Sequence, residues 1–135
     1  MKKTILSGLI AGVILFILSV ASLYLTVWLF PSLARQYFNP AFNVQEKRAM
    51  IFFVHPFVIS LCLAWFWNRF KGVLSGSFFS KGVEFGLIYV VIATFPTMWL
   101  IYSAISVSFA MVVTWMLFGF LQGLIAGLVF EKTNP

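Results

Sequence analysis

Three long stretches of the sequence contain no Lys, Arg, Asp or Glu residue. They run from Ile5 to Phe30, from Ala49 to Asn68 and from Phe85 to Phe130, and the twelve charged residues of the chain lie outside them. A helix needs about 20 mostly apolar residues to cross a hydrocarbon layer of roughly 30 Å. The first and second stretches are therefore each long enough for one membrane crossing.

The third stretch is too long for a single crossing. As one helix, it would be about 69 Å long at a rise of 1.5 Å per residue. Turn-forming residue types occur near its middle, at Ser103, Ser106 and Ser108, so we expect a helical hairpin. The sequence thus predicts an all-α integral membrane protein with one domain, residues 1–135, in which four transmembrane helices form an up-down bundle. We place these helices at about residues 4–30, 48–68, 83–102 and 106–130.

The composition agrees with a membrane protein. Hydrophobic residues make up 62% of the chain and charged residues only 9%, against about 25% charged in soluble domains. The net charge of +6 does not indicate a nucleic-acid partner, because the basic residues flank the predicted helices instead of clustering on one face. We expect membrane lipids as the immediate partners.

The distribution of basic residues predicts the orientation of the chain. With an even number of spans, both termini lie on one side of the membrane. That side holds six basic residues and the other side three, Arg35, Lys47 and Arg48. Lys and Arg are enriched in cytoplasmic segments, so we predict cytoplasmic termini and a bacterial or archaeal cytoplasmic membrane.

The N-terminal segment resembles a secretory signal in some respects. Met1-Lys2-Lys3 precedes an apolar stretch, and small residues follow at 19–21. The apolar stretch continues to Phe30, which is longer than the apolar region of a signal peptide. We therefore expect an uncleaved first transmembrane helix.

Small residues predict where helices approach one another, since close approach holds helices together in lipid. Glycines at four-residue spacing occur at the same predicted depth in the first and fourth helices: Gly8, Gly12, Gly119, Gly123 and Gly127. We expect these two helices to cross there, or the repeats to form the seam of a homo-oligomer or larger membrane complex. Gln122 lies among the glycines, and its amide is expected to bond a helix carbonyl or its own copy in a second chain.

His55 is the most informative polar residue within the predicted spans. It is the only histidine and is followed by Pro56, and ionisable residues inside a membrane are functional candidates by default. We predict an outer-leaflet ligand pocket from His55 and the hydroxyl groups at its depth: Tyr24, Thr26, Thr94, Thr97, Ser106 and Ser108. Alternatively, His55 hydrogen-bonds across the bundle, contacts a quinone, relays protons or ligates haem. We predict no resident metal or cofactor, because no second ligand lies at metal-binding spacing.

Other polar residues carry less information. Glu84 lies at the cytoplasmic entry of the third span, level with Arg69, so an ion pair between them is expected. Ser19, Ser22 and Thr26 follow Gly8 and Gly12 along one stripe of the first helix, which seats another helix or lines a thin polar track. The chain contains no aspartate, which excludes a Ser-His-Asp hydrolase.

These features rank three functions. The first is a small membrane protein without catalytic machinery that oligomerises or docks on membrane partners and binds a lipid or other apolar ligand in its outer half. The second is an oligomeric transporter or pore for a small solute. The third is a quinone-, haem- or lipid-linked enzyme that uses His55.

Overall fold

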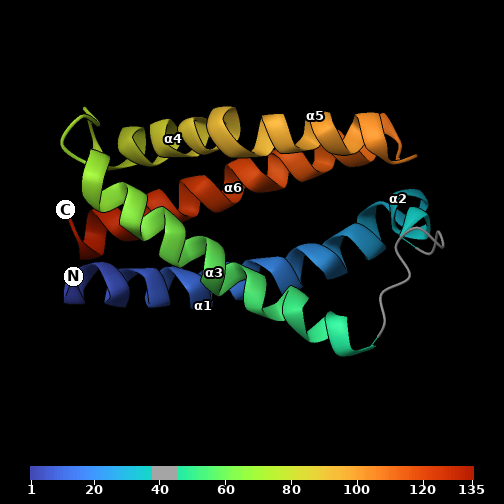
Figure 1. Ribbon diagram of the computed structural model, residues 1–135, viewed down its shortest axis with the longest axis horizontal. Helices are drawn as coiled ribbons and strands as arrows, with labels where there is room; N and C mark the ends of the chain where they lie inside the picture. The colour runs from blue at the N-terminus through green and yellow to red at the C-terminus, as the bar shows by residue number, and fades with distance from the viewer. Residues whose placement is uncertain (38–45) are drawn as a thin grey trace.

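The computed structural model describes residues 1–37 and 46–135, with the side chains of 46–49 left undescribed. Every regular element in these ranges is a helix, and each span lies side by side with the others (Figure 1). The elements are α1 (Lys2–Leu29), α2 (Pro31–Gln36), α3 (Glu46–Phe70), α4 (Phe78–Tyr89), the π-helical turn η2 (Val90–Thr94), α5 (Phe95–Ala104) and α6 (Phe109–Thr133). Four helical segments are long and apolar enough to cross a membrane, with α4, η2 and α5 together forming the third. The predicted four-helix membrane bundle is therefore confirmed.

The third span begins at Phe78, five residues before the predicted start. Ser77 precedes it as the N-cap, and its side chain accepts a hydrogen bond from the Ser80 N–H at 3.3 Å. Such a cap satisfies one of the amides that a helix start leaves unpaired. The glycine- and serine-rich segment after α3 is therefore shorter than the sequence alone indicated.

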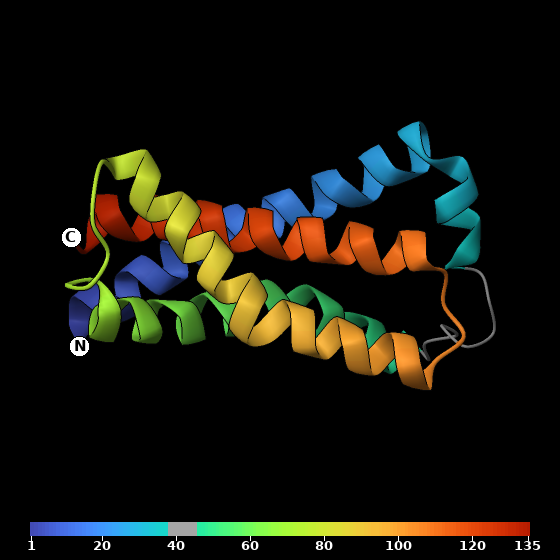
Figure 2. The same ribbon diagram turned by 90° about the horizontal axis from the view of Figure 1, so that it is seen from above.

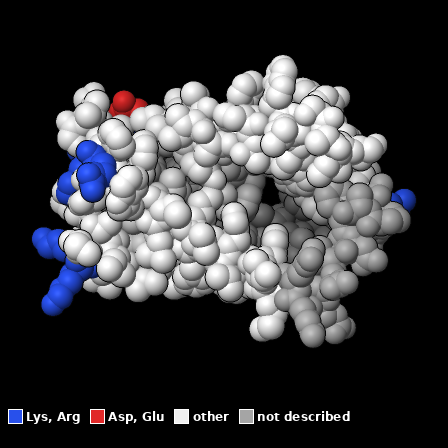
Figure 3. Space-filling model, viewed as in Figure 1, with Lys and Arg blue, Asp and Glu red and all other residues white. Residues whose placement is uncertain are grey.

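Both chain termini lie at the same end of the bundle, which we call the terminal end; the opposite end is the distal end (Figures 1 and 2). On the face shown in Figure 3, Lys and Arg side chains gather at the terminal end and the middle of the bundle carries none. This separation follows from the cost of placing a charged side chain in hydrocarbon. The prediction that the terminal end faces the cytoplasm depends on these charges.

The bundle consists of two helical hairpins that meet along α1 and α6. Helix α1 packs on α3, α4 packs on α6, and α1 also contacts α6. Helix α5 touches α6 but buries none of its residues. The two hairpins therefore form the main contacts of the fold, and α5 lies at its edge.

Glycines set the close approach within each hairpin. A Cβ atom added to Gly12 would lie 2.8 Å from the Ser60 Oγ on α3, and one added to Gly123 would lie 2.9 Å from the Gly86 Cα on α4. The prediction that the glycines of the first and fourth helices face each other is wrong, because each set faces its own hairpin partner. The five glycines are buried within one chain, so they provide no exposed seam for a second copy.

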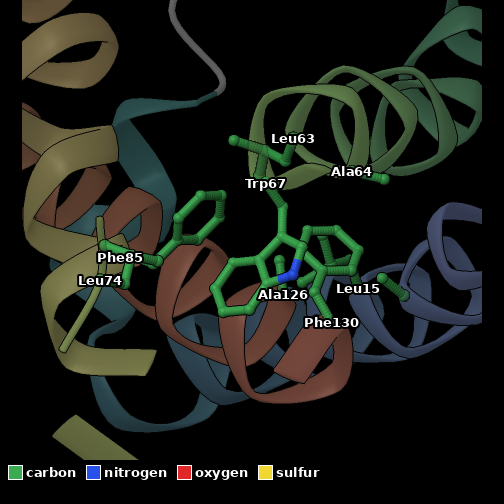
Figure 4. Close-up of a cluster of buried hydrophobic side chains, with 9 residues drawn as sticks. Leu15, Leu63, Ala64, Trp67, Leu74, Phe85, Ala126 and Phe130 are labelled. Carbon is green, nitrogen blue, oxygen red and sulfur yellow. The ribbon is translucent and has the colours of Figure 1, made fainter. Parts of the chain in front are cut away.

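A dense aromatic core fills the terminal half of the bundle (Figure 4). Trp67 of α3 is fully buried, with its ring centroid 5.2 Å from that of Phe85 and 5.9 Å from that of Phe130. Its indole N–H donates to the Asn134 carbonyl at 3.0 Å, and the Lys71 Nζ donates to the Asn134 Oδ1 at 3.2 Å. Trp67 thus joins α3 to both helices of the other hairpin.

The ion pair of the terminal end differs from the predicted one. Among the described residues, the salt bridge joins Lys81 to Glu131 at 2.8 Å, whereas the Arg69 guanidinium lies 5.3 Å from the centroid of the Trp65 ring. The expected pair of Glu84 with Arg69 is wrong, because α4 packs on α6 and not on α3.

The Lys81–Glu131 pair is expected to contribute little to stability. Its side chains are 24% and 16% exposed, and partly solvated pairs contribute about 0.5 to 1 kcal/mol. A double-mutant cycle with Lys81→Ala and Glu131→Ala, using the free energy of unfolding in mild detergent, should give a coupling of that size that falls as salt is added. The same cycle with the exposed Lys132 in place of Lys81 should give no coupling; equal couplings would contradict the pairing.

Candidate functional site

The structure does not gather the predicted pocket residues around His55. His55 is exposed, as are Tyr24, Thr97 and Ser106, and among the predicted set only Thr26 lines either of the two cavities described below. Burial on α3 follows Pro56, Ser60, Ala64 and Trp67. This stripe faces the rest of the bundle, and one residue before Pro56 a side chain points about 100° away from it. The helical phase of α3 therefore directs His55 outward.

Thr94 and Ser108 have structural positions instead. Thr94 is buried against α6, where a Cβ added to Gly119 would lie 2.7 Å from the Thr94 Oγ1. Ser108 is the N-cap of α6: its Oγ accepts from the Met111 N–H at 3.3 Å and donates to the Gln36 Oε1 at 2.6 Å. The hydroxyl groups of the predicted pocket are thus distributed over separate contacts.

The largest described cavity lies between the distal halves of α1 and α6 and has a volume of about 830 Å³. Figure 3 shows a hollow in this half of the molecule. Helix α1 contributes residues from Ser19 to Leu29, and α6 contributes residues from Thr114 to Leu121. Helix α2 lines its distal end with Pro31, Ala34 and Arg35. The cavity exists because the aromatic core that joins the hairpins occupies only the terminal half.

The cavity walls are apolar in effect. The lining includes four hydroxyl side chains, but three of them donate to carbonyls of their own helix: Ser19 to Leu15 at 2.8 Å, Thr26 to Ser22 at 2.8 Å and Thr114 to Ala110 at 2.8 Å. Such back-bonding satisfies a hydroxyl without a ligand. The predicted stripe of Ser19, Ser22 and Thr26 therefore lines a cavity, yet it does not form a polar track.

Polar side chains meet at the distal mouth of the cavity. Arg35 and Tyr37 line it from the α2 side, and Trp115 lines it from α6. The Trp115 indole N–H donates to the Tyr37 hydroxyl, and the Gln36 side chain bonds Ser108. These two contacts hold α2 across the distal ends of α1 and α6. The sequence analysis did not include Arg35 and Trp115 in a site, because the contact that brings α2 onto α6 has no local sequence signal.

A second cavity, of about 630 Å³, lies between α3 and the α4–η2 segment. Its lining is apolar apart from Cys62 and Tyr89: Ile59, Leu61, Leu63, Trp65, Phe66, Phe85, Ile88, Ile92 and Ala93. His55 is seven residues before Cys62 and so lies on the same side of α3, beyond the lining. With no charged group in its lining, this cavity offers less to fix a ligand than the first.

Metal chemistry has no assembled ligand set in the part of the chain that the structure describes. No group of three or more His, Cys, Asp or Glu side chains is positioned there to hold an ion. Searches against protein-family models, curated proteins and solved structures gave no match. The site must therefore be interpreted from its own geometry.

Proposed function

We propose that this chain is a non-catalytic membrane protein that binds a lipid, with one acyl chain in the cavity between α1 and α6. The observation that carries the proposal is an apolar cavity of about 830 Å³ whose polar groups lie at one end. Ligand pockets of proteins span about 300 to 1,000 Å³ and combine apolar walls with a few polar groups that fix orientation. An amphiphile has the same division between an apolar chain and a polar head.

The depth of the cavity fits one leaflet of a bilayer. The α1 lining runs from Ser19 to Leu29, which corresponds to about 15 Å at 1.5 Å per residue. One half of a hydrocarbon core of roughly 30 Å has this thickness. An acyl chain of the distal leaflet can therefore enter the cavity while its headgroup stays level with α2.

Lipid binding is favoured over the two alternatives by the placement of polar groups. A transporter needs a polar path through the terminal half, where the described core is apolar around Trp67, Phe85 and Phe130. An enzyme based on His55 needs that side chain in a pocket, whereas it is exposed and lines neither cavity. The cavity between α1 and α6 requires neither condition.

Filling the cavity is expected to abolish lipid retention. Ser22→Trp on α1 and Leu117→Trp on α6 place an indole in the cavity from opposite walls. After purification in mild detergent and addition of a dioleoyl phospholipid, native mass spectrometry should show at least a fivefold lower lipid-bound fraction for each variant than for the wild type. The loss follows because the indole occupies the volume that the acyl chain needs.

Two matched variants control for the added tryptophan. Tyr24→Trp and Val113→Trp introduce the same side chain on the same helices at exposed positions outside the cavity lining. Both should retain lipid like the wild type. Retention of lipid by the two cavity-filling variants would overturn the proposal.

A further inference from the structure

We infer that the cavity selects an anionic phospholipid, whose phosphate pairs with the Arg35 guanidinium at the distal mouth. The inference rests on the proposed function, since it assigns the headgroup of the lipid whose chain occupies the cavity. Arg35 is the one charged side chain in the lining. Guanidinium pairs with phosphate through two parallel hydrogen bonds and stays protonated at all physiological pH values.

No described residue neutralises Arg35. The salt bridge of the described residues is at the terminal end, between Lys81 and Glu131, and Glu84 is on α4 near the same end. The described side chains therefore leave a net positive charge at the distal mouth. An anionic headgroup compensates this charge, whereas the ammonium group of a zwitterionic headgroup finds no described carboxylate there.

The position of Arg35 is fixed by its short helix. Gln36 and Tyr37, which follow Arg35 directly, bond Ser108 and Trp115 of α6. Arg35 itself is exposed, so its guanidinium can reach a headgroup without a rearrangement of the fold. Trp115 and Tyr37 are residue types that prefer the headgroup level of a bilayer, and this places the Arg35 charge at the depth of lipid phosphates.

The cavity favours a lipid over a soluble phosphate. Three of the four hydroxyl groups in the lining are satisfied by their own helix, so the walls below Arg35 supply an apolar surface and almost no free donors. A soluble phosphate would gain one charge contact there and leave the apolar volume empty. A lipid uses both parts of the site.

Headgroup selectivity of the Arg35 variants tests the inference. Dioleoyl phosphatidylglycerol and dioleoyl phosphatidylethanolamine have the same chains, and native mass spectrometry in mild detergent should show about fivefold preferential binding of the former to the wild type. Arg35→Gln should bind both lipids equally, and Arg35→Lys should retain part of the preference, because the charge remains but the bidentate geometry is lost. Lys132→Gln, which removes a basic charge at the terminal end, should bind like the wild type.

The outcomes separate this inference from the proposed function. Equal binding of both lipids by Arg35→Gln, with retention still lost in Leu117→Trp, supports both. An unchanged preference in Arg35→Gln overturns the headgroup assignment and leaves the chain-binding cavity intact. Full retention of phosphatidylglycerol by Leu117→Trp overturns both, and displacement of the lipid by an equal concentration of glycerol 3-phosphate overturns the lipid as the occupant.

Discussion

Replacing Gly123 with leucine is expected to separate α4 from α6 and destabilise the bundle by about 3 kcal/mol. A Cβ atom at Gly123 would already lie 2.9 Å from the Gly86 Cα and 3.0 Å from the Tyr89 Cβ. The first of these contacts is with backbone, which cannot move away as a flexible side chain can. The whole α4–α6 contact must then widen to admit the leucine side chain.

The loss of close approach has a large effect because of the solvent. Lipid tails are as apolar as a leucine side chain, so burial of apolar surface does not by itself drive transmembrane helices together. Van der Waals contact between the two helices is the main gain, and it falls steeply once a gap of even 1 Å opens. Gly123 and Gly86 face each other at this contact, so the effect should be greatest there.

The measurement is the free energy of unfolding, obtained by titration with a denaturing detergent and followed by circular dichroism. Gly72→Leu is the matched control, because nothing lies within 4 Å of a Cβ at that position and its φ is not positive. It should unfold like the wild type. Equal stability of Gly123→Leu and wild type would show that α4 and α6 do not pack through these glycines.

The number and order of the membrane helices were predictable, because charge exclusion acts on each segment separately. A stretch such as Phe85–Phe130 excludes charged residues whatever its neighbours are, and its length alone requires a hairpin. The partner of each helix was not predictable in this way. Gly8, Gly12 and Gly123 indicate that a close neighbour exists, but the spacing contains no information on which helix it is.

The candidate site was harder to predict because the helices are apolar on nearly every side. In a water-soluble protein, the polar face of a helix identifies its exposed side, whereas here both buried and lipid-facing positions are apolar. On α1, small residues distinguish the buried face, with Ser7, Gly8, Ala11 and Gly12 all buried. No such signal marked the phase of α3 at His55, and a long-range contact placed Arg35 at the cavity.

Replacing Trp67 with alanine is expected to cost roughly 3 kcal/mol of unfolding free energy. Trp67 is fully buried and contacts the rings of Phe85 and Phe130, so its removal leaves a hole where α3 meets both helices of the second hairpin. The Asn134 carbonyl also loses the indole donor. Trp67→Phe keeps most of the packing and loses only this hydrogen bond, so it should cost about 1 kcal/mol.

Trp65 provides the matched control for Trp67 on the same helix. Its side chain is 58% exposed, and its ring contacts the Arg69 guanidinium, a type of interaction that contributes about 0.5 to 1 kcal/mol at exposed sites. Trp65→Ala should therefore cost no more than that in the same detergent titration. If Trp65→Ala were as destabilising as Trp67→Ala, the face of α3 that packs on the bundle would be the opposite one, and His55 would then point into the interior.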